Sequence, residues 1–339
     1  MKFLAVRFWR RVKMLAGTIV ACTVLFVLYM VWMPERGYQG PFLPLSLEET
    51  ELSQKLLAHV TKLSGDIGPR SLANYGELIR AQAYIQRTWS QEGLDVRRQD
   101  FKVDGKVVAN VYTEFPGSYN SKEILVIGAH YDTVGDSCPG ADDNGTGVAA
   151  LLELALRFKQ FTPAITVRFV AFVNEEMPYF RTEAMGSYLA ARRSKERGEN
   201  VVAMISLETL GYYSDQPGSQ KYPAGLSLFY PDRGDFLAFV GDLRSANLVR
   251  RAISIFRRHT TFPSEGIAAP QAIPGIGWSD HAAYWTQGFP AIMLTDTAPF
   301  RYPDYHRDTD TADKINPDKL ARVVMGIEEI IHGMSRANR

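Results

Sequence analysis

The 339-residue sequence predicts an α/β fold, in which helices cover both faces of a mixed, mostly parallel central sheet, preceded by one N-terminal transmembrane helix. Three observations support this prediction. Apolar runs of strand length, such as Ile124 to Ile127, alternate with segments whose apolar residues recur at helical spacing. The pair Asp104-Gly105 between two strand-like segments predicts an antiparallel hairpin. Residues 14–33 contain no charged residue and are long enough to cross a bilayer as a helix.

The first 36 residues are predicted to form a basic tail and an uncleaved membrane anchor. The residues that lead from the apolar run into Pro34 are large, whereas a signal-peptide cleavage site needs small ones. Basic residues gather only before the run, so we expect a single-pass protein with a cytoplasmic N-terminus and an extracytoplasmic catalytic domain, periplasmic in a bacterium. These basic residues are Lys2, Arg7, Arg10, Arg11 and Lys13. The alternative is a helix buried in the core.

Residues 37–46 are predicted to be a linker, and residues 47–339 a single domain. Periodicity and turn residues assign its elements. In chain order, these are a helix from Ser46 to about Leu63, a helix at Tyr75–Gln91, strands at Val96–Val103 and Val107–Phe115, a strand from Ile124, a helix from Val148, a strand at Ile165–Val173, a helix at Ala184–Arg193, a strand at Val201–Leu207, a partly helical segment at Phe236–His259, a loop at Thr261–Trp278, a short helix from Ser279, a strand at Ala291–Leu294 and a helix at Pro317–His332.

Charge and cysteine content narrow the possible partners. A formal net charge of +1 argues against nucleic acid as the main partner. Cys22 lies in the apolar run and Cys138 in a loop, so we expect no disulfide between them. Cys138 as a metal ligand is a weaker alternative, and the oligomeric state is left open.

Polar side chains follow three of the predicted strands. His130 follows the strand that begins at Ile124, Glu175 and Glu176 follow the next, and Glu208 ends the third. Because ligands bind outside the carboxyl ends of strands in such sheets, these side chains and Asp143 are expected to converge on a metal site. The alternatives are a helix cap at Asp143, an ordinary loop histidine and a solvated acidic turn.

Five ordered motifs resemble those of the bacterial leucyl aminopeptidase family, the two-zinc exopeptidases of metallopeptidase family 28. The motifs are Gly-Ala-His-Tyr-Asp at 128–132, Gly-Ala-Asp-Asp-Asn-Gly-Thr-Gly at 140–147, Asn-Glu-Glu at 174–176, Ser-Asp-His at 279–281 and Tyr-His-Arg-Asp-Thr-Asp-Thr at 305–311. The resemblance spans roughly Leu47 to the C-terminus. It implies an enzyme that hydrolyses the N-terminal bond of peptides or dipeptides. Together with the anchor predicted from the first 36 residues, this predicts a membrane-anchored exopeptidase.

The resemblance also implies the metal ligands of two Zn²⁺ ions. Asp143 would bridge them, with His130 and Glu208 on one ion and Glu176 and His306 on the other. Imidazoles and carboxylates suit zinc, and a pair of ions can polarise a carbonyl and activate water. The family usually has Asp at the position of Glu208.

Further roles follow from the same resemblance. Glu175 would be the general base, and Asp132 would orient His130. Positions around the metals or the substrate would be occupied by Asp280, His281 and Asp310. A tyrosine that often precedes the Ser-Asp-His motif has no counterpart at residues 276–278.

Two alternatives remain from other classes of protein. One is a glutaminyl cyclase-like acyltransferase, which shares the fold and uses one zinc but lacks the first histidine, so His130 argues against it. The other is a membrane-anchored binding module that keeps the fold without metals. Competent side chains at every expected ligand position argue against the second.

Overall fold

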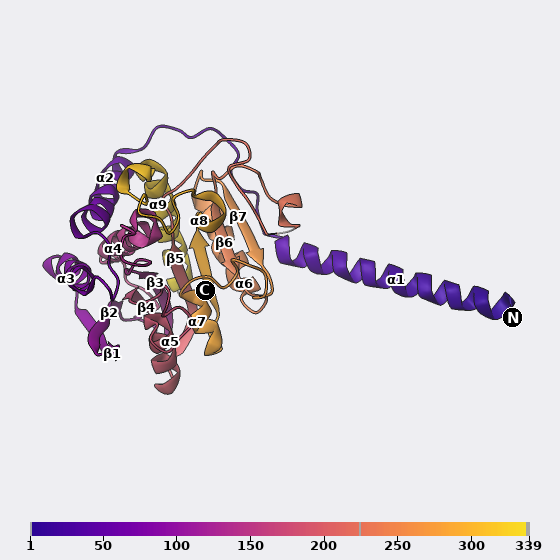
Figure 1. Cartoon of the computed structure of the whole chain (residues 1–339), viewed down its shortest axis with the longest axis horizontal. Coiled ribbons are helices and arrows are strands. Elements are labelled where there is room, and N and C mark those ends of the chain that lie inside the picture. Colours follow the sequence, from indigo (N-terminus) through magenta and orange to yellow (C-terminus); the bar gives the residue numbers. More distant parts are fainter. Residues whose placement is uncertain (1, 224, 337–339) are drawn as a thin grey trace.

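The structure is a computed structural model, which describes residues 2–223 and 225–336, with the backbone alone at residues 2–6, 8 and 10. The basic side chains of Lys2 and Arg10, and residues 337–339 of the predicted domain, therefore lie outside the described part. An eight-stranded sheet lies between helices, and one long helix projects away from this body (Figure 1). The predicted fold class is confirmed.

The helices and strands alternate along most of the chain. The described helices are α1 (Lys2–Val31), α2 (Leu47–Thr61), α3 (Tyr75–Gln91), α4 (Gly147–Phe158), α5 (Gly186–Glu196), α6 (Ala246–His259), α7 (His281–Thr286), α8 (Ala298–Arg301) and α9 (Pro317–Ser335). The strands are β1 (Val96–Val103), β2 (Lys106–Phe115), β3 (Asn120–His130), β4 (Ile165–Phe172), β5 (Asn200–Glu208), β6 (Leu237–Gly241), β7 (Ser264–Ala268) and β8 (Ala291–Thr295).

The sheet has the order β1-β2-β4-β3-β5-β8-β6-β7. Its four middle strands, β4, β3, β5 and β8, are mutually parallel. Strand β2 is antiparallel to both of its neighbours, β1 and β4. Strand β6 is antiparallel to β8 but parallel to β7. The carboxyl ends of the middle strands therefore meet at one edge of the sheet, which is where an open α/β sheet binds ligands.

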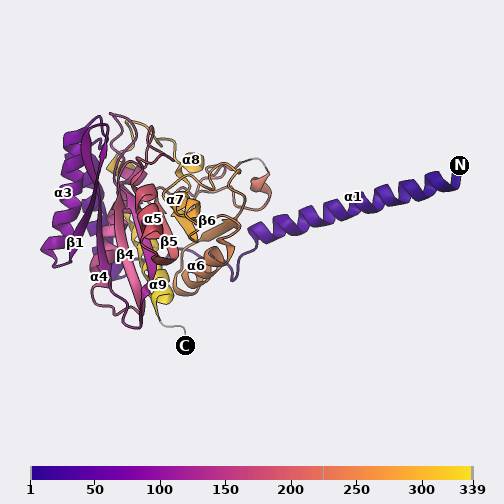
Figure 2. The ribbon, with the colours of Figure 1, turned by 90° about the horizontal axis from the view of Figure 1, so that it is seen from below.

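Each face of the sheet has its own apolar core. Apolar residues of α2, α3, α4, α6 and α9 pack on one face, and those of α5 and α7 pack on the other. The view in Figure 2 is turned by 90° and shows α3 and α5 on opposite sides of the strands. Because both faces are covered, the middle strands are apolar along most of their length, as the sequence pattern predicted.

Local signals in the sequence account for several element boundaries. The Ser46 side chain accepts a hydrogen bond from the backbone N–H of Glu49, whose carboxylate accepts one from the Ser46 N–H, so α2 begins with a capping box. Asp104 and Gly105 have φ values of +48° and +78°. These are the positive values that a tight hairpin turn requires, so the predicted hairpin is confirmed.

One prediction for the last third of the domain was wrong, because the segment Thr261–Trp278, predicted to be a loop, contains β7. The prediction that Phe236–His259 is partly helical is confirmed by α6, although the segment also contains β6, which was not predicted. Each strand has five residues, too few for a clear alternating pattern. Strand β7 is also an edge strand with Gly266 at its centre, and a central glycine weakens the signal of a strand.

Helix α1 is the one described helix that is long and apolar enough to cross a membrane, at Arg11–Val31 with a mean hydropathy of 2.3. Only 6% of this span is buried, so the alternative of a core helix is wrong. Its exit is held by α6, because Arg250 donates a 2.7 Å hydrogen bond to the Tyr29 carbonyl and lies 4.4 Å from the Tyr29 ring centroid. Residues 37–46 form neither helix nor strand, and Phe42 packs against Phe262 of the domain.

Candidate metal centre

The candidate ligands come from five separate segments that meet at the carboxyl edge of the sheet. His130 ends β3 and Glu208 ends β5, two strands that are direct neighbours. Glu176 follows β4, the neighbour of β3 on its other side. Asp143 lies in an irregular turn, Ala141–Thr146, that leads into α4, and His306 lies in the loop after α8. The fold therefore brings together side chains that are up to 176 residues apart in the sequence.

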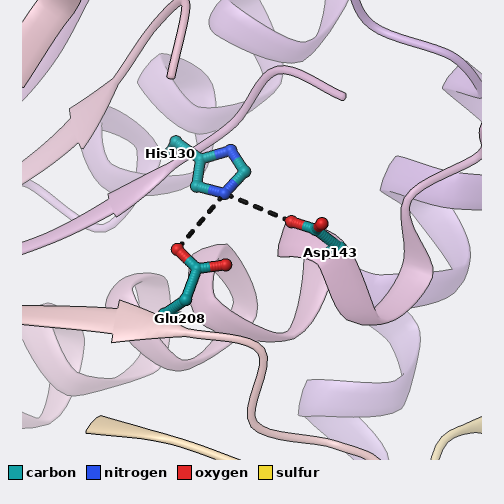
Figure 3. A group of neighbouring side chains, drawn as sticks. All are labelled: His130, Asp143 and Glu208. Atoms are coloured by element: carbon teal, nitrogen blue, oxygen red, sulfur yellow. Dashed lines mark ion pairs between the residues drawn. The ribbon is translucent and has the colours of Figure 1, made fainter. Parts of the chain in front are cut away.

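The His130 imidazole lies between two carboxylates. Its Nε2 atom is 3.3 Å from Asp143 Oδ1 and 3.4 Å from Glu208 Oε2. Figure 3 shows both carboxylates directed at this nitrogen. All three residues are buried. One nitrogen and two carboxylate oxygens thus face a common point inside the protein.

Asp143 also contacts a second imidazole through its other oxygen. Asp143 Oδ2 is 3.0 Å from His306 Nε2, which is 3.4 Å from Glu176 Oε1. Each of the groups His130–Asp143–Glu208 and Asp143–Glu176–His306 places its donor atoms within 4.8 Å of one another. The Asp143 carboxylate therefore belongs to two donor sets at once, as a bridging ligand would.

Two further carboxylates hold the backbone of the ligand-bearing segments. Asp132 accepts hydrogen bonds from the N–H groups of Glu175 and Glu176, at 3.0 and 3.1 Å. Asp310 accepts from the N–H groups of Asp142 and Asp143, at 2.9 and 3.1 Å. Both carboxylates therefore hold the backbone from which the ligand side chains project.

His130 lies closer to the backbone carbonyl of Asp132 than to its carboxylate, which was the predicted partner. His130 Nδ1 lies 3.2 Å from the backbone carbonyl of Asp132 and 3.7 Å from its carboxylate. A neutral imidazole that donates Nδ1–H to this carbonyl has its lone pair on Nε2, the atom that faces Asp143 and Glu208. The backbone carbonyl of Asp132, together with its carboxylate, can therefore orient the His130 ring.

Burial and mutual repulsion perturb the acids of the centre. Burial raises the pKa of Glu175 well above its usual range, and the charges of Glu208 and Glu176 add to the effect while His130 opposes it. Burial, with the charge of Asp143, raises the pKa of Glu176 to about 7. Burial alone would raise the pKa of Asp143, but the adjacent imidazoles of His130 and His306 lower it below its usual range. Several buried carboxylates this close together can all be ionised only if a positive charge lies near them.

The arrangement fits a bound cation. Three buried atoms that face the centre, His130 Nε2, Asp143 Oδ1 and Glu176 Oε1, have no hydrogen-bond partner among the described residues. Unpaired buried polar atoms are costly, and a metal ion would satisfy all three. Imidazole nitrogens combined with carboxylate oxygens form a donor set suited to zinc. Cys138 belongs to no such donor group in the described part of the chain, and burial raises the pKa of its thiol to about 12.

The remaining predicted residues lie around this centre. Asp280 is buried, which raises its pKa to about 7, and His281 is buried with Nε2 2.8 Å from the Ile276 carbonyl. Burial lowers the pKa of His281 to about 4, so its ring is neutral. Neither belongs to the two donor sets that share Asp143.

Sequence reasoning did not single out two residues that support the site. Ser279 donates a 2.6 Å hydrogen bond to Glu208 Oε2. Arg70, fully buried, donates to the carbonyls of Tyr131, Pro139 and Gly140, and so fixes the loop before Asp143. Ser279 stands next to Asp280 in a recognised motif, which is a usable signal, whereas nothing around Arg70 in the sequence indicates its partners.

Comparison with known proteins assigns the chain to a family. The family model "Peptidase family M28" matches residues 110–331. The chain belongs to peptidase family M28. This membership supports a hydrolase, and the family predicted from the motifs is confirmed.

Relatives and solved structures agree with this membership. The uncharacterized protein YfbL of Escherichia coli is 39% identical over 287 residues, covering 82% of this chain and 87% of YfbL. A probable leucine aminopeptidase 1 of Trichophyton verrucosum is 27% identical over 236 residues, covering 64% of this chain and 56% of that protein.

Among solved structures, the fold resembles both an aminopeptidase and a cyclase. BSAP, a zinc aminopeptidase from Bacillus subtilis, superposes with a TM-score of 0.67 at 14% identity, covering 88% of this chain and 98% of BSAP. A Bacteroides thetaiotaomicron glutaminyl cyclase superposes with a TM-score of 0.62 at 20% identity, covering 83% and 97%. At these identities the likeness concerns the fold alone, so the choice between the two activities depends on the site.

Proposed function

We propose that this M28 peptidase is a membrane-anchored, zinc-dependent aminopeptidase that removes the N-terminal residue of peptides or dipeptides. The observation that carries the proposal is the Asp143 carboxylate, which has one oxygen 3.3 Å from His130 and the other 3.0 Å from His306. A carboxylate between two imidazoles, each with its own acidic partner, supports a centre for two metal ions. Glu208 and Glu176 are these acidic partners.

Two bound zinc ions would polarise the scissile carbonyl and lower the pKa of a bound water. The chain supplies the proton transfer. Glu175 is buried next to the centre, with Oε2 4.0 Å from His130 Nε2, and its carboxylate makes no hydrogen bond to any described residue. Its neighbour Glu176 faces His306. We assign Glu175 as the general base and then as the acid toward the leaving amine.

His130 argues against the glutaminyl cyclase-like alternative. A site for one zinc has no need of a second donor set, yet His130 lies within 3.4 Å of both Asp143 and Glu208. Ser279 also fixes the Glu208 carboxylate in this direction. A metal-free binding module is disfavoured because it would leave buried His130 Nε2 and Asp143 Oδ1 without partners.

Metal content and substrate choice test this proposal together. We expect the full chain, purified in detergent with zinc present, to hold close to two zinc equivalents and to release the amino acid from aminoacyl-arylamides. His130→Ala is expected to lose about one equivalent, because its donor set keeps only two carboxylates. One equivalent in the wild type, with cyclisation of an N-terminal glutaminyl peptide, would establish the cyclase instead. Absence of tightly bound zinc and of both activities would support the binding module.

We also propose that α1 spans the membrane with the basic tail in the cytoplasm and the catalytic domain on the other side. The charge asymmetry around residues 14–33 and the exposure of the span support this orientation. Reporter fusions after Gly37 test it. A reporter that is active only outside the cytoplasm is expected to be active when fused at this position. Activity of a reporter that works only in the cytoplasm would contradict the proposed orientation.

A further inference from the structure

An apolar pocket adjoins the metal centre. Glu208 and Tyr305 lie on its wall at the metal end. Most of the remaining lining is aromatic or aliphatic, and Glu265 is a second carboxylate in it. An apolar lining of this kind is typical of a site that holds an organic side chain.

The sheet register places the two carboxylates in one row. Glu208 of β5 pairs with Thr295 of β8, Thr295 pairs with Ala238 of β6, and Ala238 pairs with Glu265 of β7. All four residues line the pocket. Three strand spacings separate the ends of the row, which is about 14 Å between the backbones. Thr295 and Ala238 have small side chains, so the middle of the row is the floor of a trough.

The carboxylate of Glu265 has no hydrogen bond or ion pair with any residue in the described ranges. Burial raises the pKa of Glu265 to about 7. The nearby Arg257 only partly offsets this effect, and the charge of Asp235 adds to it. The Arg257 guanidinium is already committed, because it donates to the carbonyls of Pro34 and Ser264. A half-buried carboxylate that forms no ion pair with a described cation is costly to keep charged.

Two tyrosines complete the far end of the pocket. The rings of Tyr222 and Tyr230 stack with centroids 5.7 Å apart, and both line the pocket beside Glu265. Their hydroxyls donate to the carbonyls of Pro231 and Gly266. Aromatic rings beside a carboxylate form a favourable environment for a cation.

We propose that this pocket receives the side chain of the substrate's first residue and that Glu265 pairs with its cationic end, so that the enzyme favours N-terminal lysine or arginine. The inference rests on the proposed aminopeptidase function. An apolar trough that ends in a carboxylate matches a long aliphatic stem with a terminal charge. A short apolar side chain would leave Glu265 unpaired and the far end of the trough unfilled.

Paired substrates and paired variants test the proposal. Lysyl- and norleucyl-arylamides have similar unbranched side chains and differ in the terminal cation. Glu265→Gln keeps the shape of the side chain but removes its charge. Asp235→Asn is the matched control, because it removes a nearby charge from a residue that does not line the pocket. The assay uses the zinc-loaded full chain, with kcat/KM measured for both substrates.

We expect the wild type to favour the lysyl substrate, and Glu265→Gln to lower its kcat/KM by about 10- to 100-fold, the range for losing a hydrogen bond to a charged group. The norleucyl substrate should change less than threefold in this variant, and Asp235→Asn should leave both substrates near wild type. A wild type that prefers norleucine, or a Glu265→Gln variant that affects both substrates equally, would overturn the proposal while leaving the aminopeptidase function intact.

A direct binding measurement separates this proposal from the failure of the proposed function. If no arylamide is cleaved, calorimetric titration with free L-lysine and L-norleucine decides the role of the pocket. Tighter binding of lysine that is lost in Glu265→Gln would support the cationic subsite in a protein of another activity. Equal binding of the two amino acids, or no binding of either, would reject it.

Discussion

The two halves of the sheet differ in the length of their strands and in what they hold. Strands β4, β3 and β5 have 8, 11 and 9 residues, and the candidate ligands His130, Glu176 and Glu208 lie at or just beyond their ends. Strands β8, β6 and β7 have five residues each, and they form the floor of the pocket. The long strands position the candidate chemistry, whereas the short strands and their long connections shape the space beside it.

This difference suggests a division of labour. A reacting centre needs side chains held within a fraction of an ångström, which long, doubly covered parallel strands provide. A pocket that selects among side chains depends on wall residues that can be replaced without moving the centre. Changes in the first half should therefore affect all substrates alike, and changes in the second should depend on the substrate.

Glu175→Gln is the strongest test of the first half. The amide keeps the shape of the side chain but cannot take a proton from water, so we expect kcat to fall by about 10²- to 10⁴-fold with little change in KM. The loss should be the same for small and large N-terminal residues. Steady-state kinetics on a panel of aminoacyl-arylamides measures it.

Glu176→Gln is the matched control for this prediction. Its oxygen lies 3.4 Å from His306 Nε2, so this change should lower zinc content, which Glu175→Gln should preserve. The group His130–Glu175–Glu176 also places donor atoms within 4.8 Å of one another, so the zinc content separates the two roles. A kcat for Glu175→Gln within about tenfold of wild type, below the usual contribution of a general base, would contradict the assignment and favour the exchanged roles.

Ala238→Leu tests the second half. Ala238 lies in the floor of the pocket between Thr295 and Glu265, and a leucine there would fill part of the trough. We expect kcat/KM for lysyl-, arginyl- and leucyl-arylamides to fall by about tenfold, since a few misplaced methylene groups cost 1–3 kcal/mol. Alanyl-arylamide should be cleaved as before. Equal losses on alanyl and lysyl substrates would show that the two halves are not independent.

The same difference explains what the sequence could predict. Long apolar strands such as β3 and β5 leave a clear pattern, and the side chains at their ends were predicted to converge, as they do. Strand β7, with Ser264 and Glu265 on opposite faces, leaves none and was predicted to be a loop. Periodicity is a sum over residues, so five residues beside a glycine fall below what it can detect.

Contacts between distant segments account for the other omissions. Asp310 was expected near the metals or the substrate, but its hydrogen-bond partners were not predicted. It accepts from the N–H groups of Asp142 and Asp143, which precede it by 168 and 167 residues in the sequence. Glu265 faces Glu208 along a row that exists only once β8 and β6 lie between them. Residue types and spacing indicate which side chains could bind a metal or a substrate. The register of the sheet decides which of these side chains share a site.

The smallest expected effect concerns the β1–β2 hairpin, which borders neither the metal centre nor the pocket. Gly105 has a φ of +78°, and a Cβ added there would meet no atom within 4 Å, so backbone strain is the sole penalty of Gly105→Ala. We expect the free energy of unfolding to fall by about 1 kcal/mol. The matched control is Gly76→Ala in α3, where there is equal space and no positive φ, and where alanine should be neutral or stabilising. Denaturant unfolding measures both, and kcat/KM should stay at the wild-type value for every substrate. A loss of activity in Gly105→Ala would mean that this edge also takes part in positioning the centre, through the Tyr179 hydroxyl that donates to Asp104.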